Sequence, residues 1–249
     1  MDFALAALFL APGLAFGSFL NVVAARVPLG RSVVRPRSAC MACSAPIAPR
    51  DNVPLLSFLL LRGRCRRCGG RIPLRYPLVE LASALLLAGC ALKFGATGRT
   101  LVAALFCLAL VAVSATDVEH LLIPNRIVVP AALAVLAGDT LARPSASWTI
   151  AAFAASGFLL VAALVYPAGM GMGDVKLAFL LGAGLGRATP VALLVGLLAA
   201  LLPALVLFAR HGAQARKMAI PLGVFLALGG VVALFAGGPL MDAYLHSLR

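Results

Sequence analysis

Residues 100–120 read TLVAALFCLALVAVSATDVEH, and this stretch decides the fold. Its first 17 residues carry no charge, and the next residue is Asp117. A helix needs about 20 apolar residues to cross the hydrocarbon core of a bilayer, so the stretch predicts a membrane-spanning helix. Ionisable side chains at membrane depth are costly, which makes Asp117 a functional candidate.

The rest of the chain has the same character. Of its 249 residues, 63% are hydrophobic and 12% are charged, whereas about half of a soluble domain is apolar. We therefore predict an all-α, polytopic membrane helical bundle of about eight spans in the lipid bilayer. The predicted spans are residues 3–25, 76–91, 100–116, 121–141, 148–168, 175–186, 189–209 and 220–241. The sixth is short and glycine-rich, which is typical of a helix that lines a cavity instead of facing lipid.

Basic residues predict the orientation of these spans, because cytoplasmic loops carry an excess of Lys and Arg. Residues 26–75 contain eleven arginines and one acid, Asp51, so we place them in the cytoplasm. Alternating eight spans from there puts 16 basic residues on the cytoplasmic side and five on the other. Beyond 26–75, the cytoplasmic set is Arg126, Lys176, Arg210, Arg216 and Lys217, and the opposite set is Lys93, Arg99, Arg143, Arg187 and Arg249.

This orientation accounts for the net charge of +13. No stripe of aromatic and basic residues accompanies the charge, so we expect no nucleic-acid binding. The predicted organisation is a first span at 1–25, a cytoplasmic loop domain at 26–75 and a membrane bundle at 76–249. The sequence makes no prediction of the oligomeric state.

Two carboxylates fall at one membrane boundary in this topology. Asp117 ends the third span, which runs inward, and Asp174 begins the sixth, which runs outward. Two carboxylates that share one proton can hydrolyse a peptide bond, because like charges about 3 Å apart cannot both ionise. The alternative is that each acid reaches interfacial water or pairs with Lys176 or Arg126. Acids near loops or termini, Asp139 among them, are expected to be solvated.

The sequence around each acid favours the catalytic interpretation. Gly169, Gly171 and Gly173 precede Asp174, and glycine permits close backbone approach by an extended substrate. After Asp117, the sequence reaches Pro124 and then Asn125, and Pro124 suits the first turn of the next helix.

Four cysteines in the loop form two C-x-x-C pairs, Cys40 with Cys43 and Cys65 with Cys68. This pattern predicts one tetrahedral zinc site that folds a small zinc-ribbon-like domain. Four thiolates leave no open position on the metal, so the zinc would be structural. The alternative is a set of unmetallated thiols.

With these residues in hand, the chain resembles the type IV prepilin peptidases. Five segments carry the resemblance: GSFLNVV at 17–23 with RVP at 26–28, DNVPLLSF at 51–58, RYPLVE at 75–80 and GMGDVK at 171–176. The last matches the family's G-x-G-D-x-K motif, in which Gly171, Gly173, Asp174 and Lys176 stand. Two departures are Met41, where a proline is common, and Thr116, where an aliphatic residue is usual.

The resemblance implies an aspartic endopeptidase of the bacterial inner membrane, with Asp117 and Asp174 as catalytic residues on the cytoplasmic side. Its substrates would be prepilins or pseudopilins, cut after a glycine. The resemblance also implies methylation of the new N-terminal residue with S-adenosylmethionine. No G-x-G-x-x-G fingerprint is present, so the residues that bind this methyl donor stay unknown.

Three other functions remain open at this point. A protease resembling presenilins also uses G-x-G-D, but it lacks the paired cysteines. A transporter would use intramembrane acids as ion sites and would show internal repeats, and none is convincing here. A zinc-ribbon membrane scaffold would need neither aspartate.

Overall fold

The computed structural model describes residues 2–166, 170–212, 214 and 218–247. The end of the predicted span 148–168 lies outside the described residues, as do Gly169, Arg216, Lys217 and Arg249. The described chain is helical, without β-strands, and its only β-pairing is two isolated bridges. This confirms the predicted all-α class.

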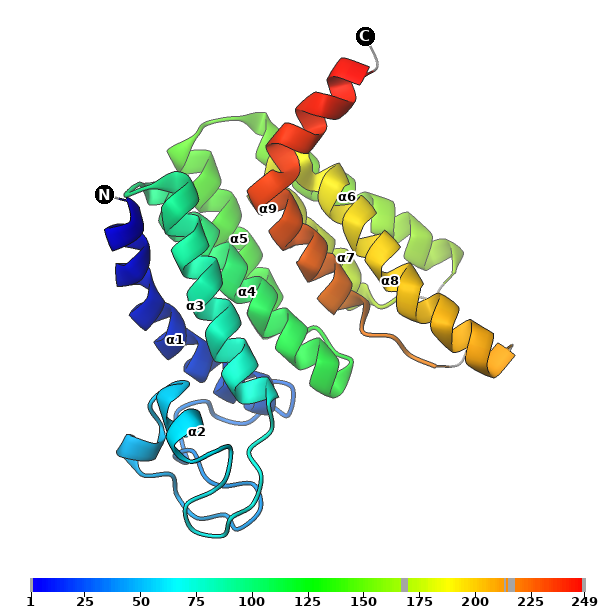
Figure 1. The fold of residues 1–249 in the computed structure, drawn as a ribbon. Helices are drawn as coiled ribbons and strands as arrows, with labels where there is room; N and C mark the ends of the chain where they lie inside the picture. The colour runs from blue at the N-terminus through cyan, green and yellow to red at the C-terminus, as the bar shows by residue number, and fades with distance from the viewer. Residues whose placement is uncertain (1, 167–169, 213, 215–217, 248–249) are drawn as a thin grey trace. The chain divides into compact units, whose positions relative to one another are not determined.

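The helices group into two compact units, Met1–Thr100 and Leu101–Arg249. The first contains α1 (Asp2–Arg26), the one-turn η1 (Pro49–Asp51), α2 (Leu56–Leu60) and α3 (Arg75–Phe94). The second contains most of α4 (Gly98–His120), then α5 (Asn125–Ala142), α6 (Ala146–Val165), α7 (Met172–Leu185), η2 (Gly186–Ala188), α8 (Thr189–His211) and α9 (Leu222–Ser247). Figure 1 shows these helices in chain order from blue to red.

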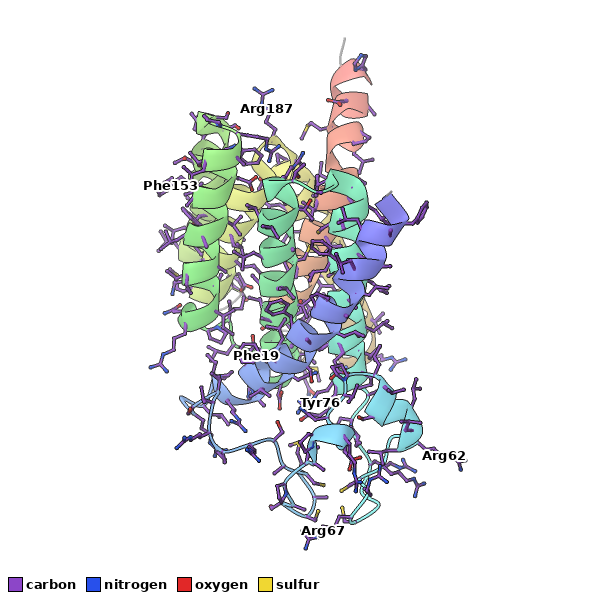
Figure 2. All side chains as sticks on the ribbon, turned by 90° about the vertical axis from the view of Figure 1, so that its left-hand side faces the viewer. Phe19, Arg62, Arg67, Tyr76, Phe153 and Arg187 are labelled. Atoms are coloured by element: carbon purple, nitrogen blue, oxygen red, sulfur yellow. The ribbon has the colours of Figure 1, made fainter. Side chains whose placement is uncertain are left out.

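In the first unit, α1 packs directly on α3. A Cβ added at Gly17 would lie 2.6 Å from the Cα of Glu80, so the two backbones touch where that residue has no side chain. Small residues allow such close approach between membrane helices. The Asn21 side chain donates a hydrogen bond to the carbonyl of Tyr76 at 3.1 Å, which fixes the end of α1 beside the start of α3. Figure 2 shows Tyr76 at the start of α3.

In the second unit, α7 is the enclosed helix. It packs against α5, α6, α8 and α9, and the side chains of Leu177, Leu180 and Leu181 are completely buried. At Gly182 the backbone of α6 comes so close that a Cβ would overlap Ala152. The prediction that the short glycine-rich segment does not face lipid therefore agrees with its burial.

Seven segments of the described residues are long and apolar enough to cross a membrane. One of them, Met172–His211, has 40 residues and would be about 60 Å long as one helix, twice the hydrocarbon thickness. It is two helices instead, because Gly186 breaks the path with a left-handed φ of 54° between α7 and α8. With 14 residues, α7 is only about 21 Å long, so it does not reach spanning length by itself.

One expectation about the acids is wrong. Asp139 is not solvated but 3% exposed, and its carboxylate accepts a hydrogen bond from the Arg143 guanidinium at 2.8 Å. The same guanidinium lies over the ring of Trp148, whose indole N–H donates to the Arg143 carbonyl. A buried carboxylate needs such a partner. We infer that these contacts stabilise the turn between α5 and α6.

Candidate active site and metal centre

Asp117 lies one turn before the end of α4 and is 5% exposed. Its carboxyl group interacts with the backbone N–H groups of Gly223 and Val224, the second and third residues of α9. The first N–H groups of a helix have no partner within the helix, so a carboxylate placed there satisfies them and meets the positive end of the helix dipole. The Oδ2 atom of Asp117 makes no hydrogen bond within the described part of the chain.

Asp174 is the third residue of α7 and is 9% exposed. Its Oδ2 accepts the N–H of Gly171, the N-cap residue, at 3.2 Å, and so caps its own helix. A Cβ added at Gly171 would lie 3.5 Å from this oxygen. Gly171 and Met172 are exposed, so the approach to Asp174 is open on this side.

Ile123, which is buried, lies against the starts of α7 and α9, the two helix ends that meet Asp174 and Asp117. A Cβ added at Gly173 would lie 2.9 Å from the Cβ of Ile123, and one added at Gly223 would lie 2.9 Å from its Cδ1. The charge of Asp117 acts on Asp174, so the two carboxyl groups interact electrostatically. Residues 57 positions apart in sequence thus lie at the same end of the second unit.

A third helix begins beside the pair. Pro124 is the N-cap of α5, directly before the helix and not within its first turn as the sequence indicated, and Asn125 is the first helical residue. The Lys176 ammonium donates to the Asn125 side-chain oxygen at 2.7 Å. This bond ties the starts of α5 and α7 together and places a cation two residues from Asp174.

Sequence reasoning missed Gly223. It lies 106 positions beyond Asp117 and belongs to none of the motifs discussed above. A side chain there would put its Cβ 2.8 Å from the Asp117 Oδ2. The sequence does indicate that a helix starts near Gly223, because Pro221 precedes an apolar run. Nothing in a single sequence says which acid faces that start.

Thr116, the departure beside Asp117, is fully buried. Its hydroxyl donates to the Val113 carbonyl one turn earlier at 2.9 Å. A polar group in an apolar environment is tolerated when it is hydrogen-bonded. The substitution therefore leaves the carboxylate of Asp117 untouched.

The four loop cysteines converge. Their sulfur atoms all lie within 4.8 Å of one another, and the Cys40 and Cys68 sulfurs are 3.8 Å apart. A tetrahedral zinc with Zn–S bonds of about 2.3 Å requires sulfurs separated by roughly 3.8 Å. The geometry of Cys40, Cys43, Cys65 and Cys68 therefore fits one four-coordinate metal ion.

The two cysteine pairs have matching backbones. The carbonyl of Cys40 accepts the N–H of Ser44 at 2.8 Å, and the carbonyl of Cys65 accepts the N–H of Gly69 at 2.9 Å. Ser44 and Gly69 both have a left-handed φ, of 55° and 69°. Each pair thus forms the same tight turn and presents two sulfurs to a common point.

The pKa values of two thiols, Cys40 and Cys68, are shifted where the four cysteines converge. Backbone N–H groups of Cys43 and Ala42 lower the pKa of Cys40 to about 6. The N–H of Gly70 acts in the same direction on Cys68, but the Cys43 thiol, desolvation, and the thiols of Cys65 and Cys40 outweigh it and raise the pKa of Cys68 to about 11. Four thiolates cannot coexist at this spacing unless a cation neutralises them, and a divalent metal would do so.

Comparison with known proteins relates the chain to two family models. The model of the bacterial peptidase A24 N-terminal domain matches residues 12–94, and that of the type IV leader peptidase family matches residues 104–209. No solved structure matches the chain.

Three relatives are called prepilin leader peptidase/N-methyltransferase. The protein of Bacillus subtilis (strain 168) is 34% identical, over 94% of this chain and 95% of its own length. That of Burkholderia pseudomallei (strain 1026b) is 37% identical, over 91% and 84%. That of Pseudomonas aeruginosa is 35% identical, over 94% and 91%. The chain, a multi-pass membrane protein, therefore belongs to the type IV leader peptidase family.

Proposed function

We propose that this protein cleaves the leader peptide of type IV prepilins and pseudopilins after a glycine, and N-methylates the new N-terminal residue with S-adenosylmethionine. Family membership and the names of the relatives support both activities. The observation that carries the peptidase mechanism is the convergence of two buried aspartates, Asp117 and Asp174, on the ends of separate helices.

In the proposed mechanism, the two carboxyl groups share one proton. The ionised member takes a proton from a water molecule, and the resulting hydroxide attacks the scissile carbonyl carbon. The protonated member donates a hydrogen bond to the carbonyl oxygen, and a proton then passes to the amine as the C–N bond breaks. The titration belongs to the pair, so neither Asp117 nor Asp174 is assigned one role.

The surroundings of the pair suit this chemistry. The N-termini of α7 and α9 direct N–H groups at the two carboxyl groups, which favours the single negative charge of the pair. The Asp117 Oδ2 makes no hydrogen bond among the described residues, so it is available for the shared proton or the water. Gly171 is exposed and leaves room for an extended substrate backbone beside Asp174, whereas the space at Gly173 is filled by Ile123.

We propose that the four-cysteine cluster holds a structural zinc ion, with Cys40, Cys43, Cys65 and Cys68 as its ligands. The sulfur spacing fits zinc, and four thiolates complete its coordination. S-adenosylmethionine would supply the methyl group to the new amine. Its binding residues are not assigned.

We place the protein in the bacterial inner membrane, with the aspartate pair at the cytoplasmic face. The basic loop 26–75, with eleven arginines, supports this orientation.

Mass spectrometry of a co-expressed prepilin tests the proposal, because it gives the cleavage site and the methylation together. We expect Asp117→Asn and Asp174→Asn each to abolish cleavage while the protein remains in the membrane. Asp242→Asn, at an exposed acid near the other end of α9, is the matched control and should cleave normally. Normal cleavage by either of the first two variants would refute the aspartate mechanism.

A further inference from the structure

The short helix α2 exposes an apolar surface in the middle of the basic loop. Leu59 and Leu60 are 69% and 72% exposed, and Leu56 beside them is also exposed. Ser57 on the opposite face is buried. Three neighbouring exposed leucines on five residues are unfavourable in water, so their surroundings require an explanation.

A hydrogen bond fixes the depth of this helix. The N–H of Leu55, the residue before α2, donates to the Oε2 of Glu80 at 2.8 Å. Glu80 is the sixth residue of α3, about 7.5 Å along the axis from Arg75. Since α3 has 20 residues and is about 30 Å long, it matches the hydrocarbon thickness. The Glu80 side chain leans back toward the start of α3, so its contact with Leu55 lies near the boundary of the hydrocarbon core.

Backbone N–H groups around α2 are hydrogen-bonded within the protein, as an environment without water requires. Leu55 adopts a left-handed φ of 57°, and the N–H of the next residue, Leu56, closes a tight turn on the Pro54 carbonyl. The N–H of Val53 donates to the Ser57 hydroxyl, which donates in turn to a backbone carbonyl. Irregular backbone at membrane depth is tolerated only when its polar groups have partners.

Exposed positive charges follow α2 in the sequence. Arg62 and Arg64 come directly after it and are exposed. Figure 2 shows Arg62 projecting from the loop. Arginines that border an apolar surface are placed to meet the phosphates of lipid headgroups.

We propose that the leucine face of α2, formed by Leu56, Leu59 and Leu60, is embedded in the cytoplasmic leaflet of the lipid bilayer. The loop is then not wholly cytoplasmic but holds an interfacial anchor between its two cysteine pairs. Lipid is the favoured occupant because two exposed leucines at the start of α3, the N-cap residue Leu74 and Leu78 in the first turn, begin an apolar stripe beside this contact.

Tryptophan fluorescence in liposomes tests this placement. Leu60→Trp is compared with Arg67→Trp, an exposed position in the second cysteine pair. The protein has one native tryptophan, Trp148, whose background is measured on the unchanged protein and subtracted. The liposomes contain phospholipids brominated near the top of the acyl chains, and aqueous iodide is the second quencher.

We expect brominated lipid to quench Leu60→Trp at least twofold while iodide has little effect, with the reverse for Arg67→Trp. Quenching of Leu60→Trp by iodide alone would place α2 in water and overturn the proposal. Protection from both quenchers would place a protein surface, a partner or a second copy, over α2 and would also overturn it. These outcomes do not depend on peptidase activity.

Discussion

Replacing Gly223 with alanine adds one methyl group at the point where α9 meets the aspartate pair. The new Cβ would lie 2.8 Å from the Asp117 Oδ2 and 2.9 Å from the Ile123 Cδ1. Non-bonded heavy atoms prefer separations of about 3.5–4.0 Å, so Asp117, Ile123 or α9 must move by roughly 0.5–1 Å. Neither neighbour is free to move, because Asp117 is on a packed helix and Ile123 contacts Gly173.

A displacement of this size is large for catalysis. A misplacement of about 1 Å can reduce a rate roughly 100-fold, which corresponds to about 2.7 kcal/mol of transition-state stabilisation. We therefore expect Gly223→Ala to slow prepilin cleavage by about 10- to 100-fold. Overpacking should also lower the free energy of unfolding by about 1–3 kcal/mol, partly offset by the higher helix propensity of alanine, about 1 kcal/mol.

Two glycines of the same helix supply controls. Gly238→Ala meets nothing within 4 Å, so it should leave the rate unchanged and raise stability by up to about 1 kcal/mol through the helix propensity of alanine. Gly230→Ala would crowd the side chains of Leu181 and Leu110 and so tests overpacking away from the carboxylates. Cleavage time courses and melting temperatures in detergent separate the two effects. If Gly223→Ala cleaves as fast as Gly238→Ala, then the N-terminus of α9 does not position Asp117.

Three further predictions concern the cysteine loop and the link between the starts of α5 and α7. Cys65→Ser or a strong chelator should release the metal and lower the melting temperature, and metal content measured beside melting curves checks this. Zinc affinity should weaken as the pH falls, because protons compete with the metal for the sulfurs. The decrease should become steeper near pH 6, where Cys40 also takes up a proton. An affinity independent of pH would contradict thiolate ligation. Lys176→Met should slow cleavage about tenfold, the value of a charge-assisted hydrogen bond of about 1.5 kcal/mol. Asn125→Ala should add little to that loss in the double variant, and additive losses would show that the bond between them does not position the site.

The sequence predicted the features that depend on local composition. Uncharged apolar runs give the spanning helices. The orientation drawn from the loop charges, which puts Asp117 and Asp174 at the cytoplasmic boundary, stays a prediction. The spacing of Cys40 and Cys43 similarly predicts a turn that presents two sulfurs. In these cases, a short segment contains the information that determines its own structure.

Features that depend on distant contacts were not predictable in the same way. Asp139 and Arg143 have the i,i+4 spacing of a helical ion pair, but their burial depends on Trp148 and the packing around it. The role of Gly223 requires knowing which helix start faces Asp117. The contact between Leu55 and Glu80 joins residues 25 positions apart, and neither residue alone indicates the depth of α2.

The enclosure of α7 has a consequence for how the enzyme responds to its membrane. A helix that faces lipid tilts when the hydrocarbon thickness changes, because its apolar length must match the bilayer. Asp174 is carried on a helix whose side chains are mostly buried in protein, and Asp117 is on α4, whose middle is buried as well. Changes in acyl-chain length therefore act on the outer helices first, and the spacing of the two acids is insulated from the hydrophobic mismatch that those helices absorb.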